Sequence, residues 1–511
     1  MRHASLIAAL VITAAAIAVG RADAATCADL AKLPLADTTV ISATVIPPGM
    51  FKAPTGNAAA QAVYARLPEF CRVTATIRPT PDSEIGIEVW LPAANWNGKF
   101  QAVGNFNWAG IILYQSLAGA LAGGYATAAT DGGHTGNSAA FAVGHPEKVI
   151  DLGYRAVHEM AVKAKTLIDA FYGAVPKLSL WNGCSQGGRQ GVAAAIRHPE
   201  DFDAIAAGAP AVNWMQLHAG RMVANRAANR TPASTIPRPH YRLVHEAVLR
   251  ACDAGDGVTD GVVEDPRSCA FDPQVLQCSA GQSVDRCLSP AQVEAARSLY
   301  KPVVHPVSGA VVLPGLVPGA ELGWNAAAAA QPVPTSLDAY RYLVFQDPKW
   351  DPARFNAATD VDRLLKADPG DVLGTSSTDL KAFFDRGGKL LLYHGWSDAQ
   401  VTPLNTIEYF NKVVSRFGRG IVGRSIQLYM VPGMDHCAGG NGTDRFDKVQ
   451  ALEQWVATGK APTAIEAEHA TAGIVDRTRP LCPYGQVAVY SGRGSTNYGQ
   501  NFACTQVAGS R

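Results

Sequence analysis

The sequence has almost no net charge, no closely paired cysteines and only one long apolar segment. Its 44 Lys and Arg residues balance 43 Asp and Glu residues, for a formal net charge of +1. No basic stripe or acidic tail interrupts this balance, which argues against a nucleic-acid-binding surface and against a disordered charged arm. No C-x-x-C spacing occurs among the ten cysteines, which argues against a zinc site or a thioredoxin-type redox site.

The apolar segment lies at the N-terminus and predicts a secretory signal. A short basic start, MRH, precedes the run SLIAALVITAAAIAVG, and small residues follow as far as Ala24. This order predicts a signal peptide over residues 1–24 that is removed on export. An uncleaved anchor is the alternative, but the run is short for a membrane span and ends in A-x-A. No Leu-rich lipobox precedes Cys27 and no later segment is long and apolar, so we expect a soluble, secreted or periplasmic protein.

Export changes how the cysteines are interpreted. An even number of cysteines in an oxidising compartment predicts disulfide bonds. Their order along the chain does not by itself determine which cysteines pair.

Strand patterns recur in the sequence and are followed by polar or Gly-rich turns. They lie at residues 98–110, 178–188, 387–403 and 425–437. An Ala-rich helical pattern, RQGVAAAIRHP, follows the second. Strands that alternate with helices indicate a mostly parallel sheet, and continuous apolar runs such as KLLLYHG suit strands buried on both faces.

A change of composition interrupts this pattern. Between about residues 212 and 376 the sheet-like alternation fades, while Pro, Ala and aromatic residues become frequent. The sequence therefore predicts an α/β core formed by residues 25–211 and 377–511, with a domain of residues 212–376 inserted into it.

The segment WNGCSQGGRQG contains a G-x-S-x-G pattern centred on Ser185. Between a buried strand and a helix, such a turn holds the serine in a strained conformation at the carboxyl edge of the sheet. Gly183 and Gly187 leave the clearance that side chains would remove. An ordinary Gly-rich turn is the alternative, but the flanking strand and helix favour a nucleophilic serine.

A nucleophilic serine needs a base, and the base needs an acid that orients it. The α/β-hydrolase order is serine, then acid, then histidine. Asp398, in HGWSDAQVTP, and His436, in VPGMDHCAGG, follow Ser185 in this order, each just after a strand pattern. Asp435 is a rival acid, but its position next to His436 in the chain makes the imidazole Nδ1 hard to reach.

Two cysteines flank this set of residues. Cys184 precedes Ser185 directly, and Cys437 follows His436 directly. A disulfide between them would hold the base within hydrogen-bond reach of the nucleophile. Pairing of either cysteine elsewhere is the alternative.

An oxyanion hole needs two backbone N–H groups. We expect one from Gln186, the residue after the nucleophile, and the second from GNFNWAG, near Phe106 or Asn107. A plain surface loop is the competing interpretation of GNFNWAG.

The segment CDAGDGVTDGVVEDP predicts a structural Ca²⁺ site in the insert. Hard carboxylate and carbonyl oxygens suit this ion, although the spacing departs from an EF-hand. The expected ligands are the side chains of Asp253, Asp256 and Asp260 and the carbonyls of Val258 and Val262. An acidic solvated loop is the alternative.

Taken together, NGCSQGGRQG, HGWSD, GMDHC and CDAGDGVTDG resemble the tannase and feruloyl esterase family, which includes mono(2-hydroxyethyl) terephthalate hydrolases. The resemblance implies an α/β-hydrolase core with an inserted lid, the triad Ser185, Asp398 and His436, and the Cys184–Cys437 bond. It also implies a structural calcium and four further disulfides: Cys27–Cys71, Cys252–Cys269, Cys278–Cys287 and Cys482–Cys504. Family members often have a Gly-richer turn where this chain has GNFNWAG, which leaves the second oxyanion donor open.

Residues that contact the substrate are harder to assign. His394 matches a family position that lines the pocket, and Trp324 and Arg341 are lid candidates. Tyr340, Phe345 and Trp350 are further candidates, although such aromatic residues also form lid cores.

The expected function is a secreted serine carboxylesterase that hydrolyses small aromatic esters of the hydroxycinnamate or gallate type. A terephthalate monoester hydrolase is the nearby alternative. A calcium-stabilised binding protein with an inactive hydrolase site is the alternative from another class. Such a protein would lack a member of the triad, whereas this sequence contains all three. A lipase ranks lower, because no long amphipathic lid helix is visible.

Overall fold

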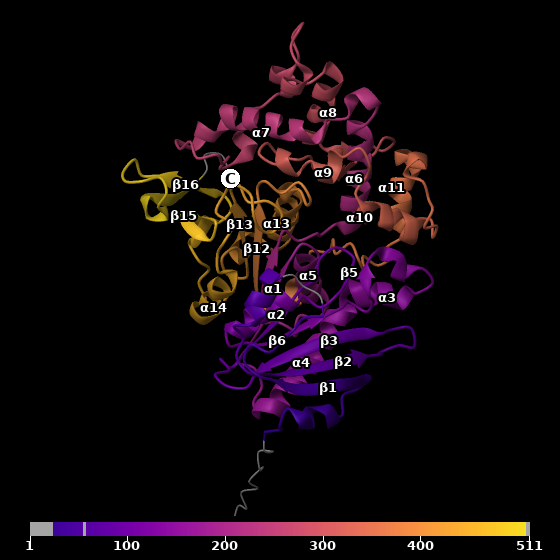
Figure 1. Ribbon diagram of the computed structural model, residues 1–511, viewed down its shortest axis with the longest axis vertical. Coiled ribbons are helices and arrows are strands. Elements are labelled where there is room, and N and C mark those ends of the chain that lie inside the picture. Colours follow the sequence, from indigo (N-terminus) through magenta and orange to yellow (C-terminus); the bar gives the residue numbers. More distant parts are fainter. Residues whose placement is uncertain (1–23, 55–57, 507–511) are drawn as a thin grey trace, which may run out of the picture.

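The described part of the computed structural model covers residues 24–54 and 58–506. The signal peptide expected over residues 1–24 lies outside it, apart from its last residue. A nine-stranded mixed sheet runs through the molecule (Figure 1). In order across the sheet, its strands are β1 (Thr38–Ile46), β2 (Phe70–Ile77), β3 (Ile85–Pro92), β6 (Ala126–Thr130), β4 (Lys99–Val103), β8 (Leu178–Cys184), β9 (Ala204–Gly208), β12 (Lys389–Gly395) and β13 (Ile426–Val431).

The direction of the strands determines where the sheet can carry a site. The strands β1, β2, β3 and β6 pair antiparallel, whereas every pair from β6 through β4 to β13 is parallel. The carboxyl ends of β4, β8, β12 and β13 therefore meet at one edge of the sheet. In sheets of this kind, ligands bind outside that edge.

The central strands are buried on both faces because their side chains alternate between two apolar layers. In β12, Leu390 and Leu392 belong to one core cluster, whereas Leu391 and Tyr393 belong to the other. All four side chains are at most 2% exposed. The continuous apolar run KLLLYHG is thus a strand covered by helices on both sides, as its pattern predicts.

Helices cover both faces of the sheet. One layer contains α4 (Ala156–Tyr172), α5 (Gln186–Arg197) and α13 (Pro403–Phe417), and the other contains α1 (Ala58–Tyr64), α2 (Tyr114–Ala122) and α14 (Lys448–Thr458). The shorter α3 (Pro146–Ile150) precedes α4. This arrangement is the α/β architecture that the sequence predicts.

The chain between β9 and β12 adds no strand to the large sheet. It forms a helical layer, at the top of Figure 1, in which α6 packs against α8, α9 and α11. The elements of this segment are α6 (Trp214–Ala228), α7 (Arg238–Cys252), α8 (Pro290–Tyr300), β10 (Val303–Val304), β11 (Val311–Leu313), α9 (Asn325–Ala328), α10 (Pro334–Asp338), α11 (Ala357–Lys366) and α12 (Lys381–Asp385). The boundaries expected at residues 212 and 376 stay a prediction.

Small sheets and disulfides complete the fold. The two-stranded sheets are β5 (Ala109–Gly110) with β7 (Gly136–Asn137), β10 with β11, β14 (Ile465–Thr471) with β15 (Ile474–Leu481), and β16 (Gln486–Tyr490) with β17 (Phe502–Gln506). The disulfides are the five pairs that the family resemblance implies: Cys27–Cys71, Cys184–Cys437, Cys252–Cys269, Cys278–Cys287 and Cys482–Cys504. Across residues 24–54 and 58–506, no helix combines the length and the apolar character of a membrane span.

Candidate active site

Ser185 lies in a sharp turn between β8 and α5. Its φ of 63° and ψ of −124° place a non-glycine residue in a sparsely populated region, which costs on the order of 1–3 kcal/mol. The turn is also crowded, because a Cβ added to Gly183 would lie 2.5 Å from the carbonyl oxygen of Gly187. The two glycines therefore allow the tight approach that exposes the serine hydroxyl at the edge of the sheet.

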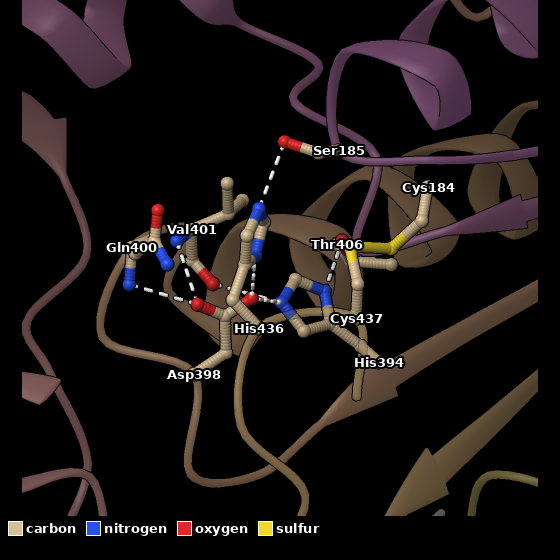
Figure 2. Close-up of a disulfide and its surroundings, with 9 residues drawn as sticks. All are labelled: Cys184, Ser185, His394, Asp398, Gln400, Val401, Thr406, His436 and Cys437. Carbon is tan, nitrogen blue, oxygen red and sulfur yellow. Dashed lines mark hydrogen bonds and ion pairs between the residues drawn. A yellow bond between two sulfur atoms is a disulfide. The ribbon is translucent and has the colours of Figure 1, made fainter. Parts of the chain in front are cut away.

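The loops after β12 and β13 bring an acid and a histidine to this hydroxyl. The Nε2 atom of His436 lies 2.8 Å from Ser185 Oγ, and its Nδ1 lies 2.6 Å from Asp398 Oδ2 (Figure 2). A carboxylate only accepts hydrogen bonds, so Nδ1 carries the proton and Nε2 accepts from the serine hydroxyl. Asp435 takes no part in this chain of bonds; its backbone N–H donates to the carbonyl of Gly439. The geometry is that of a serine, its base and an orienting acid.

Asp398 is completely buried and held by four donors. The backbone N–H groups of Gln400 and Val401 donate to Oδ1, and the imidazoles of His436 and His394 donate to Oδ2. Burial raises the pKa of Asp398, but the charge of His436 and the hydrogen bonds of both histidines outweigh it and hold this pKa well below its usual value. The acid therefore stays ionised beside the base at neutral pH.

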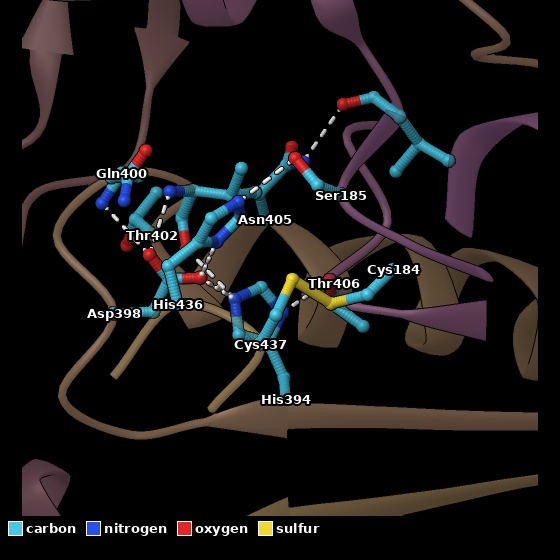
Figure 3. Close-up of polar contacts among 12 residues, drawn as sticks. Cys184, Ser185, His394, Asp398, Gln400, Thr402, Asn405, Thr406, His436 and Cys437 are labelled. Carbon is cyan, nitrogen blue, oxygen red and sulfur yellow. Dashed lines mark hydrogen bonds and ion pairs between the residues drawn. A yellow bond between two sulfur atoms is a disulfide. The ribbon is translucent and has the colours of Figure 1, made fainter. Parts of the chain in front are cut away.

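His394 does not line the pocket, and the expectation that it does is corrected. Its side chain is fully buried, with Nε2 at 3.1 Å from Asp398 Oδ2 and at 2.8 Å from the carbonyl of Val401. Its Nδ1 lies 2.8 Å from the hydroxyl of Thr406 on α13 (Figure 3). Because both partners of Nε2 are acceptors, Nε2 carries the proton and Nδ1 accepts from Thr406. His394 therefore donates to the carboxylate of Asp398 and helps to hold it in position.

A disulfide joins the chain segment that carries Ser185 to the segment that carries His436. Cys184 and Cys437 are bonded, with 6.0 Å between their Cα atoms and 253 residues between their positions. One half-cystine is the residue before Ser185, and the other is the residue after His436 (Figure 2). The bond therefore ties the nucleophile turn directly to the loop that carries the base.

The loop after β4 lies against the nucleophile turn. The side-chain oxygen of Gln190, on α5, accepts from the backbone N–H of Asn105 at 3.0 Å, and its amide nitrogen donates to the side chain of Asn105 at 3.1 Å. Phe106 and Asn107 follow and line the same cavity as Ser185, and Asn107 has a φ of 45°. Gln186, the first residue of α5, is buried beside the serine. The oxyanion roles of Gln186 and Phe106 stay predictions.

A cavity of about 770 Å³ opens at Ser185 and His436. Its walls come from the loop after β4, from α2, from the end of β8, from β12 and from the segment that begins α14. Aromatic side chains line it at Phe106, Tyr125, Tyr393 and Phe446. None of its described lining residues lies between β9 and β12, so the walls belong to the α/β core.

The two lid candidates for substrate contact are therefore corrected. Trp324 is completely buried, with its ring 5.5 Å from that of Tyr300 and 6.0 Å from that of Tyr241. Arg341 is half-buried, and its Nε donates to the carbonyl of Trp350 at 3.3 Å. Both side chains stabilise the helical layer and lie outside the cavity that contains Ser185.

Comparison with known proteins places this geometry in a family. The sequence profile described as tannase and feruloyl esterase matches residues 71–505. The chain is 38% identical to an uncharacterized esterase from Xanthomonas campestris pv. campestris, over 99% of this chain and 94% of that relative. The chain belongs to the tannase and feruloyl esterase family. It is also 33% identical to the mono(2-hydroxyethyl) terephthalate hydrolase of Piscinibacter sakaiensis, over 88% of this chain and 86% of that enzyme.

A solved structure of the tannase and feruloyl esterase family agrees with the fold. The crystal structure of feruloyl esterase B from Aspergillus oryzae matches with a TM-score of 0.86 at 30% identity, over 94% of this chain and 99% of that chain. The family resemblance inferred from the sequence motifs is thereby confirmed. The expected α/β-hydrolase fold is confirmed as well. Proteins of this family are carboxylic ester hydrolases, and so is this member.

The expected calcium loop of this tannase-family member follows α7. The carboxylate of Asp253 accepts the backbone N–H groups of Asp260 and Gly261 at 3.0 and 2.9 Å, which folds the loop back on itself. The carboxylate of Asp260 forms ion pairs with Arg477 and Arg479 from the C-terminal hairpin. The loop therefore joins the helical insert to β15.

Asp256 has no such cationic partner among the described residues. Burial raises the pKa of its carboxyl, and the nearby charges of Asp260 and Asp253 add to this effect. The three side-chain carboxylates and the two carbonyls are all oxygen donors, which is the ligand type that Ca²⁺ prefers. We propose that a structural Ca²⁺ binds here through Asp253, Asp256, Asp260 and the carbonyls of Val258 and Val262.

Removal of calcium is expected to lower thermal stability before it affects catalysis. EGTA should lower the Tm by about 3 °C, because an ion bound only to the folded state at a hundred times its Kd contributes about 2.7 kcal/mol and the entropy of unfolding of a chain of this length is about 1 kcal/mol/K. Differential scanning fluorimetry with and without added Ca²⁺ measures the shift. In the Asp256→Asn variant, most of this shift in Tm should disappear. Asp285→Asn, in an exposed turn of the same insert, should show the same shift as the wild type. An unchanged Tm in the wild type would refute the calcium assignment.

Proposed function

We propose that this protein is a secreted serine carboxylesterase that hydrolyses aromatic esters of the hydroxycinnamate or gallate type. The observation that carries the proposal is the bonded series Ser185, His436 and Asp398, with 2.8 Å and 2.6 Å between the partners. Secretion is supported by five disulfides and by the signal pattern at the N-terminus.

The mechanism follows from which atoms donate and which accept. His436 Nε2 takes the hydroxyl proton of Ser185 as Oγ attacks the ester carbonyl, and Asp398 stabilises the imidazolium that forms. In this proposal, backbone N–H groups of Gln186 and of the Phe106 region stabilise the oxyanion. His436 then protonates the leaving alcohol, and a water molecule, activated by the same base, releases the acid from the acyl-enzyme.

Aromatic substrates are favoured by the walls of the cavity. Phe106, Tyr125 and Phe446 line the cavity with rings on which a phenyl ring can pack. A volume of about 770 Å³ lies in the range of cavities that bind drug-sized ligands, which leaves room for an aromatic acid and its alcohol.

A second candidate function is the hydrolysis of terephthalate monoesters. It is favoured by the 33% identity to the mono(2-hydroxyethyl) terephthalate hydrolase of Piscinibacter sakaiensis over most of both chains. Both candidates use the same triad and acyl-enzyme, and they differ only in the aromatic acid.

A panel of four esters separates these candidates. Methyl ferulate, methyl gallate, chlorogenate and mono(2-hydroxyethyl) terephthalate are compared by kcat/KM under one set of conditions. We expect the highest value for a hydroxycinnamate or gallate ester. A kcat/KM for mono(2-hydroxyethyl) terephthalate above those for the other three esters would favour the second candidate. If the enzyme hydrolysed none of the four, both candidates would be refuted.

A further inference from the structure

Lys448 provides the cationic side chain on the wall of the cavity that opens at Ser185. It is the first residue of α14, and its neighbours Asp447 and Val449 line the cavity with it. Among the described lining residues, no other lysine and no arginine occurs. The remaining walls are glycine, apolar and aromatic residues and neutral polar groups, apart from His436 and Asp447.

Aromatic rings hold the ammonium group of Lys448 in place. Its Nζ lies 5.6 Å from the ring centroid of Tyr393 and 5.3 Å from that of Phe446. The two rings are themselves in edge-to-face contact, with 5.2 Å between their centroids. Cation–π contacts of this kind fix the direction of the side chain without neutralising its charge. Tyr393 belongs to β12, the strand that leads to Asp398, and Lys448 lines the same cavity as Ser185 and His436.

Nearby carboxylates have other partners. The carboxylate of Asp447 accepts the backbone N–H of Gln450 at 2.8 Å and caps α14. Glu453, further along α14, accepts from Lys99 at 2.6 Å and from the hydroxyl of Tyr125 at 2.5 Å. Within the described chain, no carboxylate lies within ion-pair distance of Lys448. The lysine thus presents a positive charge that the protein itself does not pair.

From these contacts we propose that Lys448 binds a free carboxylate of the substrate, so that the preferred esters carry a negative charge besides the ester to be cleaved. The inference rests on the proposed esterase function and specifies its substrate class. The carboxylate belongs either to the acyl part, as in a terephthalate monoester, or to the alcohol, as in a quinate ester. A charge-assisted hydrogen bond to the ammonium of this half-buried lysine gives the preference its strength.

The test compares matched charged and neutral esters. Monomethyl terephthalate and dimethyl terephthalate differ by a free carboxylate on the acyl part, and chlorogenate and its methyl ester differ by a free carboxylate on the alcohol part. In the Lys448→Met variant, the ratio of kcat/KM for the charged ester to that for the neutral ester should fall about tenfold in one pair. The affected pair identifies the side of the ester that Lys448 binds.

Two further variants distinguish recognition from a general effect of charge. Lys448→Arg should keep most of the preference, because it retains the cation. Lys412→Met removes an exposed lysine of α13 that pairs with Glu408 outside the cavity, so its ratios should match those of the wild type. In the wild type, added salt should weaken the preference.

The outcome that overturns the inference leaves the esterase function intact. If Lys448→Met leaves the ratio of kcat/KM for the charged ester to that for the neutral ester unchanged in both pairs, Lys448 does not recognise a carboxylate. This holds whether or not kcat/KM itself falls. Absence of turnover of all esters by the wild type would instead refute the proposed function itself.

Discussion

The Ser185→Ala variant is expected to hydrolyse ethyl ferulate about 10⁵-fold more slowly than the wild-type enzyme. The loss is large because alanine removes the atom that forms the acyl-enzyme, whereas the cavity and the oxyanion donors stay in place. His436→Ala should cost about as much, since the two residues act as one unit and their effects do not add. Steady-state kinetics on purified variants, with circular dichroism as a check of folding, measures both.

A second serine in the same cavity provides the control. Ser116, on α2, lines the cavity but takes no part in the bonds to His436. Ser116→Ala should therefore change kcat by no more than a few-fold. Turnover by Ser185→Ala close to that of the wild type would remove the basis of the proposed mechanism.

Loss of the Cys184–Cys437 bond is expected to lower both activity and stability. In the Cys184→Ala/Cys437→Ala variant, kcat should fall about 100-fold, because a displacement of about 1 Å between base and nucleophile has an effect of that size. The free energy of unfolding should fall by about 2–5 kcal/mol, as for other native disulfides. Kinetics on methyl ferulate and thermal unfolding measure the two effects separately.

The disulfide between Cys482 and Cys504 offers a matched comparison. Cys482, the residue after β15, bonds to Cys504 of β17, and neither cysteine lines the cavity. The Cys482→Ala/Cys504→Ala variant should lose stability but keep the kcat of the wild type. If both double variants lost activity to the same degree, the Cys184–Cys437 bond would have no particular role in positioning His436.

Much of the core could be predicted from the sequence because its strands are short, continuous apolar runs followed by functional turns. The order of Ser185, Asp398 and His436 along the chain was enough to predict their meeting, since parallel strands bring their carboxyl ends to one edge of the sheet. The antiparallel strands β1 to β3 were not predicted. The exposed and half-buried residues of β1 alternate only weakly, so this edge strand carries a faint signal.

The cavity could not be predicted because it depends on packing between distant elements. Lys448 and Ser116 face the same space only once α14 and α2 lie on one side of the sheet. Residue type misled the prediction at Trp324, since a large aromatic residue suits a lid core as well as a substrate pocket. For His394, the family resemblance implied a position that lines the pocket, but its burial against Asp398 became visible only in the structure.

One measurement tests the central claim most directly. The enzyme is labelled with a fluorophosphonate probe and digested without reduction, and the peptides are analysed by mass spectrometry. We predict that the adduct lies on Ser185, and that its peptide is joined through Cys184 to the peptide that contains His436 and Cys437. An unlabelled Ser185, or a Cys184 bonded to any other cysteine, would contradict the claim that a disulfide holds the nucleophile and its base together.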